Sequence, residues 1–331
     1  MRTGREQRNG RNGRLRRAAF MAAMLLLLPL FAACGSGGGA KSGRPCAVAT
    51  NFAVYDILRS VAGDTAEVEM LLPPETESHD YEITLADAAR IARADLFLCV
   101  GGESEDWVFD TLDAMDPADR PLVVYAIEVC RTVEESSESV LETAEAGIHG
   151  DSGEEPETDE HVWTSFGNIR LIAQAAAENL NAVDPAGAAA REENLDRYME
   201  TLDGLEGEYA SFFASTDKRL IAVADRFPFR YLAEEWDLDY VAAFSGCTSN
   251  VEASLATVNA LVDTVRRNAL PCVFKIELSD GRCADAVAGE TGCDVLTLQS
   301  GHNVTRAEFA AGKTLTDLMR ENLGALRTAL Q

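Results

Sequence analysis

The alternation of short apolar runs with helix-patterned stretches is the feature that most constrains the fold of this chain. Strand-like runs at 46–50, 66–72, 96–101 and 122–127 are separated by helix-like stretches at 53–62, 85–94 and 105–115. A second series has strand-like runs at 220–224, 240–244, 273–276 and 295–298, with helix-like stretches at 251–268, 281–291 and 305–330. Strands that alternate with helices form parallel sheets. The sequence therefore predicts an α/β fold with two parallel-sheet lobes, residues 45–183 and 218–331.

One long helix, residues 184–214, is predicted to link the two lobes. Asp184 and Pro185 provide an N-cap followed by a proline at the first helical position. Apolar side chains then recur at spacings of three and four, namely Leu195, Tyr198, Leu202, Leu205, Tyr209 and Phe212. At 1.5 Å per residue such a helix is roughly 45 Å long, enough to contact both lobes. We expect it to limit the relative motion of the lobes and to leave a cleft between them.

The charge of the chain excludes one class of partner. The sequence has 55 Asp and Glu against 29 Lys and Arg, for a formal net charge of −26. Nucleic acids require a basic surface, so no nucleic-acid partner is expected. Metal cations remain suitable partners.

An acidic segment, residues 134–160, interrupts the first lobe. It contains eleven acidic residues, no Lys or Arg, one histidine, His149, and few apolar residues. This composition is typical of a loop without regular structure. Two interpretations are open: the loop collects cations and passes them inward, or it is only a solvated surface insertion.

The N-terminus has the pattern of an export signal. Residues 1–33 carry seven arginines and one acidic residue, Glu6, and end in an apolar run of 16 residues at 18–33. That run is shorter than the ~20 residues that a membrane-spanning helix needs, so 1–33 is predicted to be a signal peptide.

Residues 30–34, Leu-Phe-Ala-Ala-Cys, resemble a bacterial lipobox, although Phe31 stands where Leu is usual. Cys34 would then receive a lipid, and the Gly/Ser-rich residues 34–44 would form a flexible tether. We expect a lipid anchor that holds the protein on the extracytoplasmic face of the cell membrane. The alternative is an ordinary cleaved signal peptide.

Seven cysteines remain after Cys34, and their number is odd. Export favours disulfides. We expect one among the four cysteines of the C-terminal third, Cys247, Cys272, Cys283 and Cys293. Cys99 and Cys130 lie in or beside apolar runs and are predicted to be buried. No Cys-x-x-Cys pair occurs, so a thiolate zinc site is not expected.

Three of the four histidines, His79, His161 and His302, lie next to predicted strand ends or helix starts. Loops at these positions converge in the crevice of α/β lobes, where ligands bind. Neutral imidazole is a good ligand for Zn²⁺ and also binds Mn²⁺. Any one of the three alone is more often a surface or structural histidine, so it is their shared placement that makes them candidates for one site.

A series of motifs carries a resemblance to a known family. In chain order these are Asn-Phe-Ala-Val-Tyr-Asp at 51–56, Ser-His-Asp-Tyr-Glu at 78–82, Glu-Asp-Trp at 105–107, Asp-Glu-His-Val-Trp at 159–163 and Phe-Arg-Tyr-Leu-Ala at 229–233. Together they resemble the metal-specific solute-binding lipoproteins of zinc and manganese ABC importers. The resemblance covers nearly the whole chain after the signal.

This resemblance implies a receptor without catalytic turnover, which holds a cation between its lobes through about four side chains and delivers it to an ABC permease. His79 and His161 match the first two ligand positions. At the third position the chain has Arg226, whose guanidinium cannot ligate a cation. Asp225 could reach the metal instead, and Arg226 could pair with Glu277.

The fourth ligand position that the resemblance implies falls on either Gln299 or His302, and the histidine is the better zinc ligand. Glu277 could be a further ligand or only the partner of Arg226. Three histidines with Glu277 or Asp225 would favour Zn²⁺ over Mn²⁺, which prefers oxygen ligands. The alternative is that a metal chelate or another cationic solute is bound.

Two other classes of function compete with the receptor. Three histidines and a carboxylate could hold a zinc that activates water, as in a zinc-dependent hydrolase. However, the sequence has no His-Glu-x-x-His, Gly-x-Ser-x-Gly or phosphate-loop motif. A surface adhesin on the same fold is the other alternative.

Overall fold

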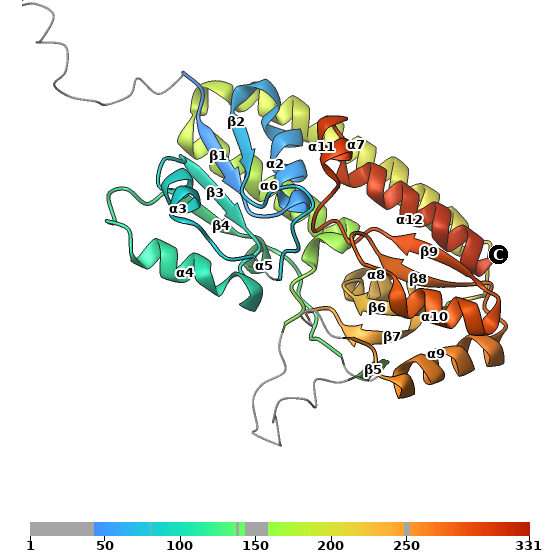
Figure 1. The fold of residues 1–331 in the computed structure, drawn as a ribbon. Coiled ribbons are helices and arrows are strands. Elements are labelled where there is room, and N and C mark those ends of the chain that lie inside the picture. Colours follow the sequence, from blue (N-terminus) through green and yellow to red (C-terminus); the bar gives the residue numbers. More distant parts are fainter. Residues whose placement is uncertain (1–42, 80, 137–138, 143–157, 248–251) are drawn as a thin grey trace, which may run out of the picture. The chain divides into compact units, whose positions relative to one another are not determined.

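The computed structural model describes residues 43–79, 81–136, 139–142, 158–247 and 252–331. Two parallel sheets, each packed against helices, follow one another along the chain (Figure 1). The predicted α/β fold with two parallel-sheet lobes is therefore confirmed. All eight predicted strands are present, with ends that differ by a few residues.

The first sheet has the strand order β2-β1-β3-β4. Its strands are β1 (Cys46–Ala49), β2 (Glu67–Met70), β3 (Leu96–Cys99) and β4 (Leu122–Tyr125), and its helices are α2 (Phe52–Ala62), α3 (Leu85–Ile91), α4 (Asp106–Asp113), α5 (Ala126–Val129) and α6 (Phe166–Val183). The residues of β3 are all buried, as expected for a strand in the middle of a parallel sheet.

The second sheet has the order β5-β7-β6-β8-β9. Its strands are β5 (Val140–Glu142), β6 (Leu220–Phe227), β7 (Asp239–Ser245), β8 (Cys272–Ile276) and β9 (Asp294–Leu298). Its helices are α8 (Arg230–Trp236), α9 (Leu255–Asn268), α10 (Arg282–Thr291), α11 (Arg306–Ala310) and α12 (Leu315–Leu330). The last two replace the single helix predicted at 305–330, because the chain turns at Gly312 with a φ of +76°.

The prediction that residues 134–160 form a loop of the first lobe is wrong for the part that the structure describes. β5 pairs in parallel with β7 of the second sheet, and Glu134 bridges to Thr158. The Glu142 carboxylate also accepts hydrogen bonds from Ser254 and Thr257 at the N-terminus of α9. A negative charge stabilises that end of a helix, so an acidic residue has a structural use here. Residues 143–157, including His149, lie outside the described residues.

The predicted linking helix is α7 (Ala188–Phe213), preceded by a 3₁₀ turn at Pro185–Gly187. Asp184 caps that turn by accepting hydrogen bonds from Ala186 and Gly187. α7 contacts α2 and α6, which belong to the first lobe, and α12, which follows the second sheet. Figure 1 shows α7 alongside both sheets. Near its C-terminal end, Tyr209 Oη donates a 2.6 Å hydrogen bond to the carbonyl of Met319 in α12.

The apolar core is continuous from one sheet to the other. One cluster of buried side chains includes Leu98 in β3, Phe166 in α6, Tyr209 in α7, Phe274 in β8 and Leu326 in α12. Close-packed interiors resist deformation, so this continuity opposes large opening of one lobe against the other.

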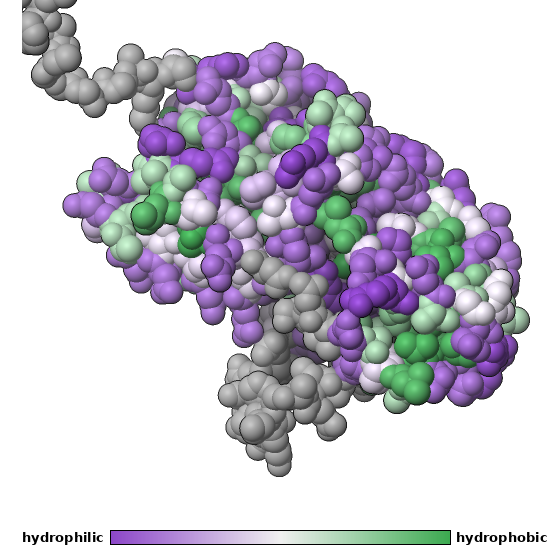
Figure 2. Space-filling model, viewed as in Figure 1, coloured by the Kyte–Doolittle hydropathy of each residue, from purple (hydrophilic) through white to green (hydrophobic). Residues whose placement is uncertain are grey.

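The outer surface is mostly hydrophilic on the face drawn in Figure 2, with scattered apolar areas. The exposed large apolar side chains of the described residues lie on different elements and loops, namely Leu85, Phe109, Leu122, Leu141, Leu255 and Leu278. Single apolar residues on a surface need no functional explanation.

The predicted disulfide is not formed. All seven described cysteines are free thiols, namely Cys46, Cys99, Cys130, Cys247, Cys272, Cys283 and Cys293. Cys99 is buried as predicted, whereas Cys130 is only partly buried. Burial raises the pKa of Cys130 to about 12, so this thiol is held in its unreactive protonated form.

The signal peptide, Cys34 and nearly all of the tether lie outside the described residues. Among the residues that are described, no helix has the length and apolar character needed to cross a bilayer.

Arg191 fixes the N-terminal end of α7. Its side chain is fully buried, and its guanidinium donates to Asn181 Oδ1 at 2.7 Å, to Thr65 Oγ1 at 3.0 Å and to the carbonyl of Asp184. These contacts join α7 to the end of α6 and to the turn after α2.

We expect Arg191→Met to lower the free energy of unfolding by about 2–4 kcal/mol, because it leaves buried acceptors without donors. Urea unfolding followed by circular dichroism measures this change. Arg197→Met is the control, because Arg197 lies on the same helix but is exposed and bonds to Asn194. Equal stability of the two variants would contradict this role of Arg191.

Candidate metal centre

Three histidines from distant parts of the sequence meet at one point. The ligand atoms of His79, His161 and His302 all lie within 4.8 Å of one another. The ring centroids of His79 and His161 are 5.9 Å apart, those of His79 and His302 5.1 Å, and those of His161 and His302 4.8 Å. His79 follows β2, His161 directly precedes a 3₁₀ turn before α6, and His302 follows β9. The site is therefore made of loops from both lobes.

His161 and His302 are buried, His79 is partly buried, and two of the three rings have an unused nitrogen atom. His161 has no exposed surface, and 9% of the surface of His302 is exposed. The Nε2 atoms of both His79 and His161 are buried without a hydrogen-bond partner. A buried polar atom without a partner costs free energy, and native proteins rarely tolerate it without a functional reason. These two nitrogen atoms are available to a cation.

Asp159 orients the ring of His161. Its Oδ1 atom lies 3.0 Å from His161 Nδ1 and accepts a hydrogen bond from the His161 backbone N–H at 2.8 Å. A carboxylate at Nδ1 makes that nitrogen the donor and leaves the lone pair on Nε2 for a metal. Burial alone would lower the pKa of His161, but the charge and hydrogen bond of Asp159 outweigh it, and the pKa is raised.

Ser300 has the corresponding position beside His302. Its Oγ atom lies 2.7 Å from His302 Nδ1 and is itself bonded to the Glu277 carboxylate. Trp163 Nε1 donates a 2.8 Å hydrogen bond to the Ser300 carbonyl, which fixes this turn. Glu277 thus acts on His302 through Ser300.

The other two imidazoles are kept neutral. Burial, the neighbouring His161 and the charge of Arg226 lower the pKa of His79 to about 4. Burial and the charges of His161, His79 and Arg226 lower the pKa of His302 well below its ordinary value. Neutral imidazole is the form that binds a metal, so both rings are in the correct state at neutral pH.

Of the predicted site residues, His79, His161 and His302 are brought together, whereas Glu277 and Asp225 lie outside this group. Glu277 is buried and accepts hydrogen bonds from the backbone N–H groups of Ser300 and Gly301. Asp225 accepts a 2.9 Å hydrogen bond from the Arg226 N–H and lines a larger cavity bordered by α10.

Gln299, the alternative to His302, faces another element. Its backbone bonds to Asn322 and its side-chain Nε2 atom lies 3.3 Å from Glu321 Oε2, both on α12. His302 is thus the residue of this loop that joins the other two histidines.

Arg226 has a partner that the sequence analysis did not consider. Its Nη2 atom lies 2.7 Å from Glu77 Oε2, and its Nη1 atom lies 3.2 Å from Glu77 Oε1. Glu77 precedes His79 in the first lobe, whereas Arg226 lies on β6 of the second sheet, so this ion pair joins the two lobes beside the histidines.

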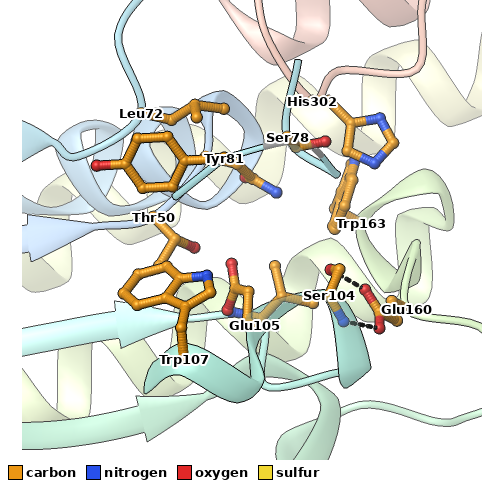
Figure 3. A pocket seen from close by; sticks show the side chains of 12 residues that line it. Thr50, Leu72, Ser78, Tyr81, Ser104, Glu105, Trp107, Glu160, Trp163 and His302 are labelled. Carbon is orange, nitrogen blue, oxygen red and sulfur yellow. Dashed lines mark hydrogen bonds between the residues drawn. The ribbon is translucent and has the colours of Figure 1, made fainter. Parts of the chain in front are cut away.

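A small cavity extends from His302 into the first lobe (Figure 3). Two buried carboxyl groups lie along it. Glu160 accepts hydrogen bonds from Ser104, drawn as dashed lines in Figure 3. Glu105 accepts bonds from the N–H groups of Val100 and Gly101 at 2.7 and 3.0 Å. Burial raises the pKa of Glu105 to about 7, although these hydrogen bonds oppose the shift.

Asp159, Ser300 and Glu77 had no assigned role in the sequence analysis, yet the sequence contains a signal for all three. Each lies two residues before one of the histidines. A side chain at that spacing can reach the backbone N–H and the ring of the histidine, as Asp159 and Ser300 do.

Comparisons with known proteins find metal-binding relatives over most of the chain. The family model of ZnuA, the zinc-uptake complex component A periplasmic, matches residues 47–329. The zinc-binding lipoprotein AdcA of Streptococcus pneumoniae is 28% identical over 306 residues, which are 91% of this chain and 59% of AdcA. The chain thus spans less than two thirds of that relative.

The high-affinity zinc uptake system protein ZnuA of Bacillus subtilis is 27% identical over 312 residues, which cover 91% of this chain and 94% of the relative. A solved structure, the Zn(II)-bound ZnuA-like domain of S. pneumoniae AdcA, superposes with a TM-score of 0.71 at 27% identity, covering 87% of this chain and 99% of that domain. Because the family model covers most of its length, the chain belongs to the ZnuA family of zinc-uptake components.

Proposed function

We propose that this chain is an extracytoplasmic receptor that captures a divalent transition metal, Zn²⁺ above all, and delivers it to the permease of an ABC importer. The observation that carries the proposal is the meeting of three imidazoles whose ligand atoms lie within 4.8 Å of one another, two of them with a buried, unpartnered Nε2 atom. The relatives are named as zinc-binding and zinc-uptake proteins, which supports the same cargo.

The donor set favours zinc. Nitrogen ligands suit Zn²⁺, whereas Mn²⁺ prefers sites rich in carboxylate and carbonyl oxygen. At Zn–N distances of about 2.0–2.1 Å, the ligands of a tetrahedral ion lie about 3.3 Å apart. Rings whose ligand atoms are within 4.8 Å can reach such an ion through small side-chain rotations. Mn²⁺ is therefore a weaker alternative cargo.

Capture and release of an ion need no catalytic turnover. His161 and His302 each have a partner at Nδ1 that holds the ring in place, so the site is organised before the ion arrives. Membership of an uptake family agrees with the expectation that the chain is not an enzyme.

The location follows from the N-terminal sequence. We propose that residues 1–33 direct export, that Cys34 carries a lipid, and that 34–44 tether the receptor to the extracytoplasmic face of the membrane. A relative named as a lipoprotein supports the anchor. A receptor held close to the membrane meets its permease at a high effective concentration.

Removing any one of the three imidazoles should weaken zinc binding. We expect His79→Ala, His161→Ala and His302→Ala each to lower the affinity for Zn²⁺ by at least about 100-fold, the upper limit of the effect of losing an outer partner. Isothermal titration calorimetry of the metal-free protein with Zn²⁺ measures the change.

Gln299→Ala is the matched control, because its side chain bonds to α12 and we expect its affinity to equal that of the wild type. Unchanged affinity in His302→Ala with a loss in Gln299→Ala would assign the ligand to Gln299. Unchanged affinity in all three histidine variants would contradict the proposed function.

Zinc affinity should fall on acidification, because protons compete for the imidazoles. His161 should protonate first, since its pKa is raised, whereas that of His79 is lowered to about 4 and that of His302 is also lowered. We expect constant affinity above the pKa of His161 and a loss of about tenfold per pH unit below it.

Competition with a chelator of known affinity between about pH 5 and 8 measures this profile. Asp159→Asn removes the charge that raises the pKa of His161, so the loss should begin at a lower pH. An unchanged onset in that variant would show that His161 does not control the acid side of the profile.

The lipid anchor can be tested by Cys34→Ser. We expect the wild-type chain to sediment with the membranes and to incorporate labelled palmitate, and the variant to do neither. Cys46→Ser is the control, because Cys46 lies at the start of β1 and should leave both properties unchanged. Palmitate incorporation in Cys34→Ser would exclude the anchor at this residue.

A further inference from the structure

We propose that Glu77 supplies a fourth, oxygen ligand to the metal, while Arg226 holds the other oxygen of the same carboxylate. This inference rests on the proposed function, because it takes the three histidines as ligands of zinc.

The histidines leave one coordination position to be filled. Zn²⁺ in a closed protein site has four ligands in a tetrahedron. The group of metal-ligating side chains found in the described residues contains three nitrogen donors and no carboxylate. The fourth ligand is therefore water or a side chain that moves when the ion binds.

Most carboxylates near the site are held firmly by backbone donors. Asp159 accepts from the N–H of His161, Glu160 from Ser104, Glu105 from Val100 and Gly101, and Glu277 from Ser300 and Gly301. Moving any of these bonded oxygens to a metal would leave a buried N–H without an acceptor, which costs about 1–3 kcal/mol. Asp159 Oδ2 is buried without a partner, but its carboxylate is bonded through Oδ1 to the Nδ1 side of the His161 ring, away from Nε2.

Glu77 differs from them in its main partner and in its position. Its two carboxylate oxygens lie 2.7 and 3.2 Å from the guanidinium of Arg226, and the backbone N–H of His79 makes a weaker contact. The Glu77 side chain is 30% exposed and lines the same small cavity as His302 and Arg226. Since Glu77 lies two residues before His79 and lines a cavity with His302, a change of its side-chain rotamer is the movement that the proposal requires.

The positive charge of Arg226 also favours a Glu77 carboxylate placed between Arg226 and the metal. Arg226 is 13% exposed and faces the histidines closely enough for its charge to act on His79 and His302. An uncompensated guanidinium there would repel a divalent cation. One carboxylate placed between the metal and Arg226 provides negative charge to both cations. Carboxylates that ligate a metal are commonly hydrogen-bonded to a second group in this way. The arrangement also explains how an arginine can stand at the third ligand position implied by the resemblance.

Three variants of the full chain test this assignment by zinc calorimetry. We expect Glu77→Gln to weaken Zn²⁺ binding by about 100-fold and Arg226→Met by no more than about tenfold, since a ligand contributes more than the partner that orients it. Glu75→Gln is the matched control, because Glu75 lies on the same loop and pairs with Arg306 at the surface. Its affinity should equal that of the wild type. Circular dichroism of the metal-free variants verifies that each is folded.

The Glu77→Gln variant also distinguishes a residue that ligates the metal from one that only positions its neighbours. In Glu77→Gln the new amide oxygen could still accept hydrogen bonds from Arg226 and from the backbone of His79, so a positioning role predicts a loss of only a few-fold. Equal losses in Glu77→Gln and Arg226→Met would mean that the ion pair only joins the lobes, and would overturn the proposal.

The crystal structure of the zinc-loaded chain is the second measurement. We expect a Glu77 carboxylate oxygen at about 2.0–2.2 Å from the ion. Water or another side chain at that position would also overturn the proposal. Neither outcome affects the proposed function, which fails separately if the wild type does not bind zinc or if the histidine variants bind it equally well.

Discussion

Desolvation of three imidazoles at one point is the constraint on which the site depends. Burial opposes protonation, so His79 and His302 remain neutral, and two ring nitrogens lack a partner inside the protein. The free energy lost by isolating these atoms is recovered when a cation accepts their lone pairs. Asp159 has the opposite effect on His161, because its charge outweighs burial and the pKa of His161 is raised. The three imidazoles are thus arranged to bind a cation.

The rest of the fold keeps these loops in place. The three histidines come from loops on both sheets, and an error in the position of either sheet would separate them. The continuous core and α7, which contacts helices of both lobes, oppose such a displacement. Arg191 at one end of α7 and Tyr209 near the other fix this helix by buried hydrogen bonds. These buried hydrogen bonds therefore fix the position of α7 against its neighbours, which it otherwise contacts through apolar side chains.

The sequence was sufficient to predict most of the architecture, because apolar runs and helix patterns report local structure. The eight expected strands and α7 are all present. β5 could not be predicted, since three residues in an acidic segment carry too weak a pattern and their pairing with β7 is a distant contact. Likewise, His302 was preferred over Gln299 on ligand chemistry, but the pairing of Arg226 with Glu77 depends on how a strand and a loop 149 residues apart meet. A pattern within one segment of the sequence cannot predict a contact between two distant segments.

The complete burial of His161 has a kinetic consequence. Exchange with solvent of an ion bound to this ring would be slowed, because the ring offers no surface to water. The lifetime of the loaded receptor would then depend on the frequency of local opening around the ring as well as on the strength of the metal–nitrogen bonds.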